Sequence, residues 1–288
     1  MALADTFDPV TFKESQLAEW QTAAPGWRKW YDVLEAETGG QVVSRKLVEV
    51  GGLGPGDTVM DIGTGYGEPA LTAAHAVMPR GHVIAVDIAA DMLAFGRERA
   101  ALAGLQNVEF LEADVETLWF DESTFDAITS RQCLQFLPDV VGTLKRLHAF
   151  LKADGRLAAA VWGPLHTVQF ALAIPVILHE LELPPPPPGR PGIFALADTG
   201  MLAQLVAEAG FRDVETGTVT AIYETTSPAD FTQWIRDVAP PIVNLVKGRP
   251  AQTQERVWRK VTEALAPLVT AQGRLRTENQ AIWVAATK

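Results

Sequence analysis

Residues 59–70 read Val-Met-Asp-Ile-Gly-Thr-Gly-Tyr-Gly-Glu-Pro-Ala, and this stretch decides the fold. It begins with apolar residues that suit a buried strand. Three glycines follow at alternate positions, Gly63, Gly65 and Gly67, and an apolar helical run then covers residues 70–77. Glycine allows a positive φ and lets the backbone approach a ligand closely, and a helix N-terminus offers free N–H groups and a positive dipole end. The pattern therefore predicts a strand, a ligand-binding turn and a helix.

Two kinds of nucleotide-like ligand use a glycine turn of this type. The dinucleotide fingerprint Gly-x-Gly-x-x-Gly places a pyrophosphate at the helix N-terminus. Here the third glycine comes one residue early and Glu68 stands at the last glycine's position, where an acid would disfavour a pyrophosphate. Asp61 followed by the three glycines instead resembles motif I of the class I S-adenosylmethionine (SAM) methyltransferases. SAM has a sulfonium, an amino group and a carboxylate but no phosphate, so an acid beside the loop suits it. An ordinary turn of another α/β protein is the remaining alternative.

The second predicted strand, residues 82–87, ends in an acid, Asp87. Nucleoside-binding α/β units carry an acid at this place, where it accepts hydrogen bonds from the ribose hydroxyls. A strand-end Asp can also cap the next helix, but Asp91 is better placed for that cap. We therefore expect Asp87 to bind ribose, and Ile88 and Met92 to pack against the adenine ring.

The next two strands place further candidates at the same edge of the sheet. In the methyltransferase resemblance, Asp114 binds the adenine amino group and the backbone N–H of Val115 serves a ring nitrogen. The segment after residues 125–130 resembles motif IV of the ubiquinone/menaquinone and sterol-type methyltransferases, where it borders SAM and the acceptor. Ser130 and Arg131 are expected to enclose the methionine end of SAM. The expected cofactor set is Asp61, Gly63, Thr64, Gly65, Gly67, Asp87, Ile88, Met92, Asp114, Val115, Ser130 and Arg131.

The composition narrows the range of partners. The chain has 288 residues, 48% of them hydrophobic and 20% charged, which is ordinary for a soluble protein with one large domain or a core and an inserted cap. Its net charge of −11 argues against a nucleic-acid partner, which leaves a small molecule as the expected partner. Oligomeric state is not predicted.

The sequence also lacks the features of cysteine metal clusters, membrane spans and secretory signals. Cys133 is the only cysteine, so no intrachain disulfide or cysteine metal cluster can form, and no metal is expected. Residues 1–10 lack the features of a secretory signal. No run reaches the about 18 apolar residues of a membrane span. We therefore expect a cytoplasmic protein without a membrane span.

The N-terminal segment, residues 1–40, is rich in aromatic residues. Aromatic side chains bury a large area wherever they lie, so they are expected either to fix a helical arm onto the core or to form a lid over the cofactor or the acceptor. The residues expected to touch the acceptor are Trp27, Tyr31, Gln135 and Trp162.

Residues 164–197 depart from a minimal core of this kind. They hold an apolar run over residues 168–183 that predicts a helix, then five prolines at positions 184–188 that form a stiff spacer or a docking segment. His166 is a candidate general base or a polar filler. The expected organisation is an N-terminal arm or lid (1–40), a SAM-binding core (41–163), a cap insertion (164–197), more core (198–224), a helical cap segment (225–272) and a final core strand (273–288).

The sequence thus predicts a Rossmann-like, three-layer α/β fold. Its sheet should have seven strands, mostly parallel with the last one antiparallel, and a helical cap should cover it. The resemblance implies SAM-dependent, in-line methyl transfer to a small, fairly apolar metabolite, with S-adenosyl-L-methionine as cofactor. The motifs do not encode whether the acceptor atom is oxygen, nitrogen or carbon. The alternatives are an NAD(P)-dependent oxidoreductase and a SAM-binding regulatory or scaffold protein without catalysis.

Overall fold

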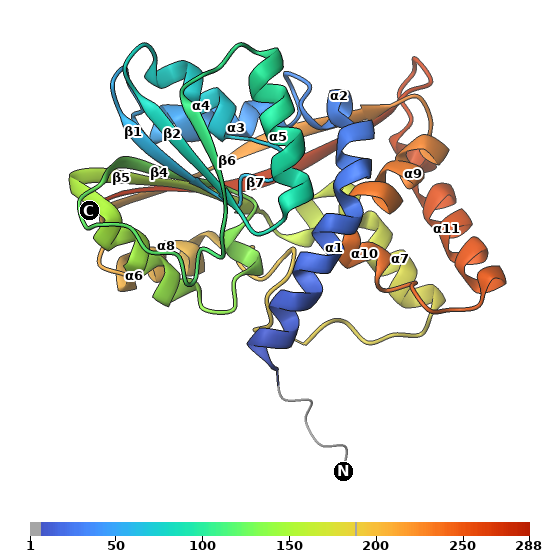
Figure 1. Ribbon diagram of the computed structural model, residues 1–288. Coiled ribbons are helices and arrows are strands. Elements are labelled where there is room, and N and C mark those ends of the chain that lie inside the picture. Colours follow the sequence, from blue (N-terminus) through green and yellow to red (C-terminus); the bar gives the residue numbers. More distant parts are fainter. Residues whose placement is uncertain (1–6, 188) are drawn as a thin grey trace.

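The computed structural model describes residues 7–187 and 189–288 (Figure 1), and in this part of the chain seven strands form one sheet. Their order is β3-β2-β1-β4-β5-β7-β6. Strands β1 to β5 pair in parallel, and β7 runs antiparallel to both β5 and β6, which confirms the predicted sheet. The strands are β1 (Thr58–Ile62), β2 (His82–Asp87), β3 (Val108–Glu112), β4 (Phe125–Arg131), β5 (Leu151–Trp162), β6 (Arg212–Thr225) and β7 (Leu275–Thr287).

Helices cover both faces of the sheet, so the core strands are apolar on both sides. In β1, Val59 belongs to the hydrophobic cluster that includes Leu71 of α4, whereas Met60 belongs to the cluster that includes Leu144 of α6 and Leu202 of α8. Figure 1 shows α3, α4 and α5 on one side of the sheet and α6 and α8 on the other. These helices are α3 (Gly40–Val50), α4 (Ala70–Val77), α5 (Ala90–Leu102), α6 (Val140–Phe150) and α8 (Thr199–Glu208).

The other helices gather beyond one end of the sheet, at the right of Figure 1. Four of them, called the cap below, pack around a hydrophobic cluster that includes Phe231 and Trp234. The arm, which is α1 and α2, crosses between α5 and the cap. The cap consists of α7 (Ala173–Glu180), α9 (Pro228–Val238), α10 (Pro240–Val243) and α11 (Ala251–Leu265), and the arm of α1 (Pro9–Lys29) and α2 (Tyr31–Leu34).

The helix predicted over residues 168–183 is wrong in its first part. Two 3-10 segments, η2 (Leu165–Thr167) and η3 (Gln169–Leu172), precede the shorter α7. The cause is a tertiary contact with the last strand. Val168 forms a β-bridge to Asn279, and the Asn279 side chain accepts a hydrogen bond from the Phe170 N–H at 2.9 Å.

The helix cap predicted for Asp91 is also wrong. Helix α5 begins at Ala90, so Asp91 lies inside its first turn. The Ala89 N–H is satisfied by Asp87 Oδ1 at 2.9 Å instead. Two further expectations reach beyond the described residues: the proline spacer includes position 188, and the expectation that the chain start is not a secretory signal includes positions 1–6.

Candidate functional site

A cavity of about 230 Å³ lies at the carboxyl ends of the central strands. Its walls come from the segments that follow β1, β2, β3, β4 and β5, and it is covered by the arm and by α9 and α10 of the cap. The strand order turns between β1 and β4, and open α/β sheets bind their ligands at such a switch point.

The glycine loop forms one wall of the cavity. Gly63 has φ 63° and Gly65 has φ 53°, a backbone region that side chains with a Cβ rarely adopt. A Cβ on Gly63 would lie 2.4 Å from the Cβ of Cys133, so the loop packs directly on the segment that follows β4. The N–H of Thr64 donates to the Val86 carbonyl at 2.9 Å, which ties the loop to β2.

Asp87 lines the cavity beside Ile88 and Met92. Its Oδ2 accepts the N–H of Gly65 at 2.8 Å, and its Oδ1 accepts the N–H of Ala89 at 2.9 Å. Burial raises the pKa of Asp87, and the backbone hydrogen bonds oppose that rise. Each carboxylate oxygen has a further lone pair for a ligand hydroxyl, so Asp87 can hold the loop and a ribose together.

Asp61 is fully buried beneath the loop and does not line the cavity. Its Oδ1 accepts from Thr129 Oγ1 at 2.7 Å and its Oδ2 from the Ala70 N–H at 3.2 Å. Burial raises its pKa to about 7, and the hydrogen bond from Thr129 is among the effects that oppose the rise. Asp61 thus connects β1, β4 and the start of α4 below the cavity floor.

The arm reaches the acid that follows β3. Asp114 and Val115 line the cavity. Lys13 Nζ of α1 lies 2.5 Å from Asp114 Oδ2 and 2.8 Å from Glu116 Oε2. Asp114 Oδ1 accepts the N–H of Glu116 at 2.9 Å. A cation of the arm therefore closes the cavity at the place expected for adenine.

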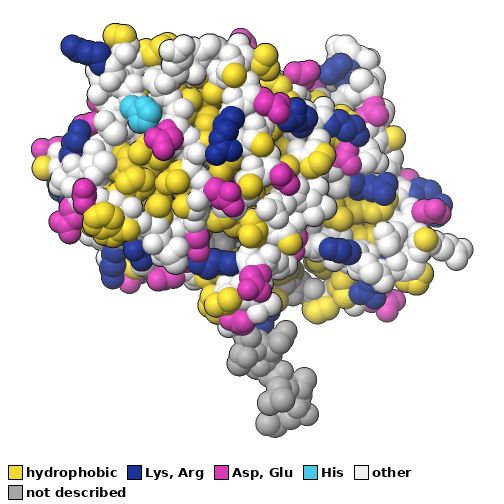
Figure 2. All heavy atoms as spheres, viewed as in Figure 1, with side chains coloured by type: hydrophobic (Ala, Val, Ile, Leu, Met, Phe, Trp, Pro, Cys, Tyr) yellow, Lys and Arg dark blue, Asp and Glu magenta, His cyan; other side chains and the backbone are white. Residues whose placement is uncertain are grey.

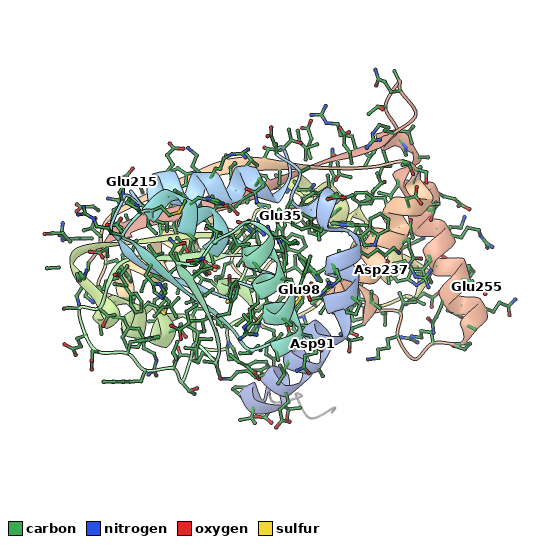
Figure 3. The ribbon with its side chains drawn as sticks, turned by 45° about the horizontal axis from the view of Figure 1, so that its top comes forward. Glu35, Asp91, Glu98, Glu215, Asp237 and Glu255 are labelled. Atoms are coloured by element: carbon green, nitrogen blue, oxygen red, sulfur yellow. The ribbon has the colours of Figure 1, made fainter. Side chains whose placement is uncertain are left out.

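A buried ion pair stands at the border between the arm and the sheet. Glu35, which follows α2, accepts hydrogen bonds from both terminal nitrogens of Arg131, at 2.7 and 3.2 Å, and the side chains are 1% and 9% exposed. Tyr66 of the glycine loop donates to Glu35 and accepts from Arg131 at 2.8 Å. Burial lowers the pKa of Arg131, but the charges of Glu35, Tyr66 and Glu68 and the hydrogen bond to Glu35 together outweigh it and hold the pKa well above its usual value. Figure 3 labels Glu35 beside α2.

A second buried pair continues this network. Arg99 of α5 lies 3.0 Å from Glu68, and the guanidinium stacks over the Tyr31 ring at 4.5 Å. Gln41 Nε2 bridges Glu35 and Glu68 at 2.8 and 2.9 Å. Glu68 is the acid whose position in the glycine loop argues against a bound pyrophosphate. Its carboxylate is thus held by Arg99 and Gln41.

Aromatic rings form the wall farthest from the strand-end acids. Trp162 at the end of β5 lies 5.1 Å from Phe170 and 6.4 Å from Tyr223, measured between ring centroids. Trp234 of α9 lies 5.3 Å from Tyr223 and 6.0 Å from Phe170. All four line the cavity, and Trp27 of α1 lines it from the arm.

The cavity brings together most of the residues that the sequence predicted for it. The predicted residues in its lining are Gly63, Thr64, Gly65, Asp87, Ile88, Met92, Asp114, Val115, Arg131, Trp27 and Trp162. The predicted residues outside that lining are Asp61, Gly67, Ser130, Tyr31, Gln135 and His166.

The residues outside the lining have other surroundings. His166 is exposed on η2, which removes the geometric basis for its role as a base. Tyr31 packs under Arg99. Ser130 is buried, and its hydroxyl has no hydrogen-bond partner among the described residues. Gln135 is buried behind Gln132, to which it donates a hydrogen bond.

Sequence reasoning missed several residues of the cavity wall. Those on the arm and in the cap come from segments without a recognisable motif. Tyr66 could have been identified from the sequence, because it lies inside the glycine loop. The missed lining residues with polar or aromatic side chains are Lys13, Gln16, Trp20, Glu35, Tyr66, Glu68, Gln132, Cys133, Phe136, Phe170, Tyr223 and Trp234.

The sheet order, the glycine loop and the strand-end acids define a nucleoside-binding α/β domain. Residues 53–171 match the family model described as a methyltransferase domain. The chain is 36% identical over 116 residues to the aklanonic acid methyltransferase DauC of Streptomyces sp. (strain C5), which covers 40% of this chain and 53% of that protein. It is 32% identical over 162 residues to the ubiquinone/menaquinone biosynthesis C-methyltransferase UbiE of Vibrio vulnificus (strain YJ016), with 53% and 62% covered.

The chain therefore carries a class I SAM-dependent methyltransferase domain related to the ubiquinone/menaquinone branch, as the motifs predicted, and SAM is the cofactor of such a domain. Its matches span between about half and two thirds of the length of these curated relatives. The solved structure of the [4+2]-cyclase SpnF superposes with a TM-score of 0.59 over 95% of this chain and 96% of that chain, at 15% identity. This last likeness shows the fold alone.

The described residues hold neither a metal-ligand cluster nor a membrane-spanning helix. No group of three or more His, Cys, Asp or Glu in this part of the chain is arranged to hold a metal ion. None of the helices described is long and apolar enough to cross a membrane.

Proposed function

We propose that this protein transfers the methyl group of SAM in line to a small, fairly apolar metabolite. One observation carries the proposal: a single cavity joins the glycine loop and strand-end acids to an aromatic wall under the arm and the cap. A SAM-binding half and an apolar half in one enclosed space are what transfer between SAM and an apolar acceptor requires.

The chain's own residues have distinct roles in this proposal. The glycine loop receives the methionine part of SAM, Asp87 the ribose, and Asp114 with Val115 the adenine. Ile88 and Met92 pack against the adenine ring. The sulfonium is already a good leaving group, so the protein mainly has to align the acceptor and exclude water. The arm and the cap, which cover the cavity, serve that exclusion.

The proposal needs no histidine base. Histidine is absent from the cavity lining in the described ranges, and His166 lies outside it. The Glu35 carboxylate is engaged by Arg131, Tyr66 and Gln41. Alignment and water exclusion therefore supply the proposed rate enhancement, and the acceptor atom is left open.

The two alternatives differ from the proposal in ways that can be measured. An NAD(P)-dependent oxidoreductase would have to place a pyrophosphate beside Glu68, which lines the cavity. A SAM-binding protein without catalysis would bind the cofactor and transfer nothing. A cytoplasmic location and the lack of a nucleic-acid partner remain predictions from the sequence.

The first test is calorimetric titration of the protein with S-adenosylhomocysteine, with NAD⁺ in parallel. We expect micromolar binding of the first and none of the second. Binding of NAD⁺ alone would overturn the proposal. Radiolabelled methyl transfer from SAM to a panel of apolar hydroxy, keto and amino compounds then tests catalysis. Tight cofactor binding without transfer to any compound would favour the non-catalytic alternative.

A further inference from the structure

Gln132, the first residue after β4, has an unusual backbone conformation. Its φ is 61°, which a residue with a Cβ adopts only at a cost. Its N–H donates to the carbonyl of Ala160 on β5 at 2.7 Å, which fixes the turn. Gln132 is one of the residues that line the cavity. Backbone strain of this kind persists where the surroundings fix it, and it clusters at functional sites.

The side-chain amide of Gln132 has one satisfied end and one open end. Gln135 Nε2 donates to Gln132 Oε1 at 3.0 Å, and Gln135 is 1% exposed. Gln132 Nε2 is buried and has no hydrogen-bond partner in the described part of the chain. A buried amide donor without a partner is unfavourable, and an oxygen atom of a bound molecule would satisfy it.

The position of this amide pair separates it from the acids assigned to the ribose and the adenine. Asp87 and Asp114 follow β2 and β3, which lie on one side of β1, whereas Gln132 follows β4 on the other side. The carbonyl of Gln135 accepts the N–H of Gly192 at 2.8 Å, and the next residue, Ile193, lines the cavity. The pair is therefore held against residues 164–197, on the side of the aromatic wall.

The charge beside Gln132 is already neutralised. Arg131 donates to Glu35 twice, to Ser44 at 3.0 Å and to Tyr66 at 2.8 Å. A charged group of a ligand would find no free counter-charge from this ion pair, whereas the amide of Gln132 offers a neutral donor.

We propose that Gln132 Nε2 donates a hydrogen bond to an uncharged oxygen of the methyl acceptor, and that Gln135 orients the Gln132 amide for this purpose. The acceptor is then a planar or apolar molecule with a carbonyl or ether-like oxygen, seated between Gln132 and the aromatic wall. This assignment rests on the proposed function, because it takes the apolar half of the cavity as the acceptor side.

The test uses two molecules of matched shape, 2-acetonaphthone and 2-isopropenylnaphthalene, which carry C=O and C=CH2 at the same place. Equilibrium dialysis measures both dissociation constants for the wild type and for the Gln132→Met variant, each with S-adenosylhomocysteine bound. The ratio of the two constants cancels the difference in hydration between the two molecules. We expect the preference for the ketone to fall about tenfold in the variant, the size of one hydrogen bond.

Two further variants make the result specific. Gln254→Met makes the same chemical change on α11, at a residue that does not line the cavity, and should leave the preference unchanged. Gln132→Glu keeps the acceptor for Gln135 but loses the donor, so it should also lose the preference. This variant carries the test if Gln132→Met does not fold.

Three outcomes would overturn the assignment: an unchanged ratio in both Gln132 variants, no ketone binding by the wild type, or a loss of S-adenosylhomocysteine affinity in Gln132→Met. The last outcome would mean that the Gln132 amide binds the methionine carboxylate of the cofactor. Dialysis without S-adenosylhomocysteine separates this failure from that of the proposed function. A wild type that binds the ketone through Gln132 but does not bind S-adenosylhomocysteine would refute only the latter.

Discussion

The two halves of the cavity draw on the chain in different ways. The proposed cofactor half is lined by residues between positions 63 and 115, where a loop or an acid follows each strand. The proposed acceptor half combines Trp27 of the arm, Trp162 at the end of β5 and Trp234 of the cap, which are far apart in sequence. A local sequence pattern can therefore predict the first half, whereas the second half depends on residues that only the folded chain brings together.

A buried network of charged and polar side chains connects these two halves. Glu35 comes from the arm, Arg131 from the end of β4, and Tyr66 from the glycine loop. A Cβ on Gly40, the first residue of α3, would lie 2.5 Å from the Glu35 carboxylate and 2.6 Å from the Arg131 guanidinium. The pair is thus closely enclosed, and the position of the arm depends on it.

The largest expected effect comes from breaking this junction. Removal of one partner leaves the other charge buried and unpaired, so Glu35→Ala should lower the free energy of unfolding by about 3–5 kcal/mol. Urea denaturation measures the change. Glu98→Ala is the matched control, because Glu98 also pairs with an arginine, Arg28, but both side chains are about half exposed. Figure 3 shows Glu98 on α5.

The control variant should change stability far less than Glu35→Ala, since exposed pairs are screened by water. Figure 2 shows acidic and basic side chains interspersed over this face of the molecule. Equal losses in the two variants would mean that the buried pair is no stronger a junction than a surface contact.

The second prediction concerns the floor of the cofactor half. The folded pKa of Asp61 is raised to about 7 by burial, so the folded chain binds a proton there more tightly than the unfolded chain does. The stability that Asp61 contributes is therefore full below the unfolded pKa of 3.8 and is lost progressively as the pH rises from there to about 7. Each unit of pKa difference corresponds to about 1.4 kcal/mol, so an effect of a few kcal/mol is expected.

The measurement is the difference in free energy of unfolding between the wild type and the Asp61→Asn variant, from pH 4 to pH 8. The difference cancels the titration of the other groups. The free energy of unfolding of the wild type should rise relative to that of the variant as the pH falls. A difference that does not change with pH would show that Asp61 titrates normally.

The limits of prediction from the sequence follow the same division. Alternating polarity, glycine turns and strand-end acids are local, so the seven-stranded, mostly parallel sheet and most of the proposed cofactor wall were predictable. Glu35 and Gln132 carry no motif, and their roles depend on partners in distant elements. The helix expected over residues 168–183 failed for the same reason, because Asn279 of β7 binds the backbone of that segment.

The third prediction tests a residue that the sequence did identify. Asp87→Ala should weaken S-adenosylhomocysteine binding by about 1.5–3 kcal/mol, the range for hydrogen bonds to a charged group. Calorimetric titration measures it. Because Asp87 also accepts the N–H groups of Gly65 and Ala89, thermal unfolding has to be recorded for the same variant. Unchanged affinity for S-adenosylhomocysteine would contradict the assignment of Asp87 to the ribose.

The smallest expected effect on stability distinguishes an arm from a lid. Lys13 of α1 is held by Asp114 and Glu116, while Lys29 at the other end of the helix lies 2.7 Å from Asp237 of the cap. Lys13→Met removes only a partly exposed contact, so the free energy of unfolding should change by less than about 1 kcal/mol. If α1 gates the cofactor half, however, S-adenosylhomocysteine should leave the variant faster, because the helix end over the adenine site is no longer held.

Stopped-flow displacement measures this dissociation rate, and Lys29→Met is the control at the far end of the same helix. A faster rate in Lys13→Met alone identifies the Lys13 end as the moving part of a lid. Equal rates in the wild type and both variants mean that α1 is a fixed arm and that its tryptophans only fill the wall. In that case the cofactor enters by another route, and the two halves of the cavity are closed by different parts of the chain.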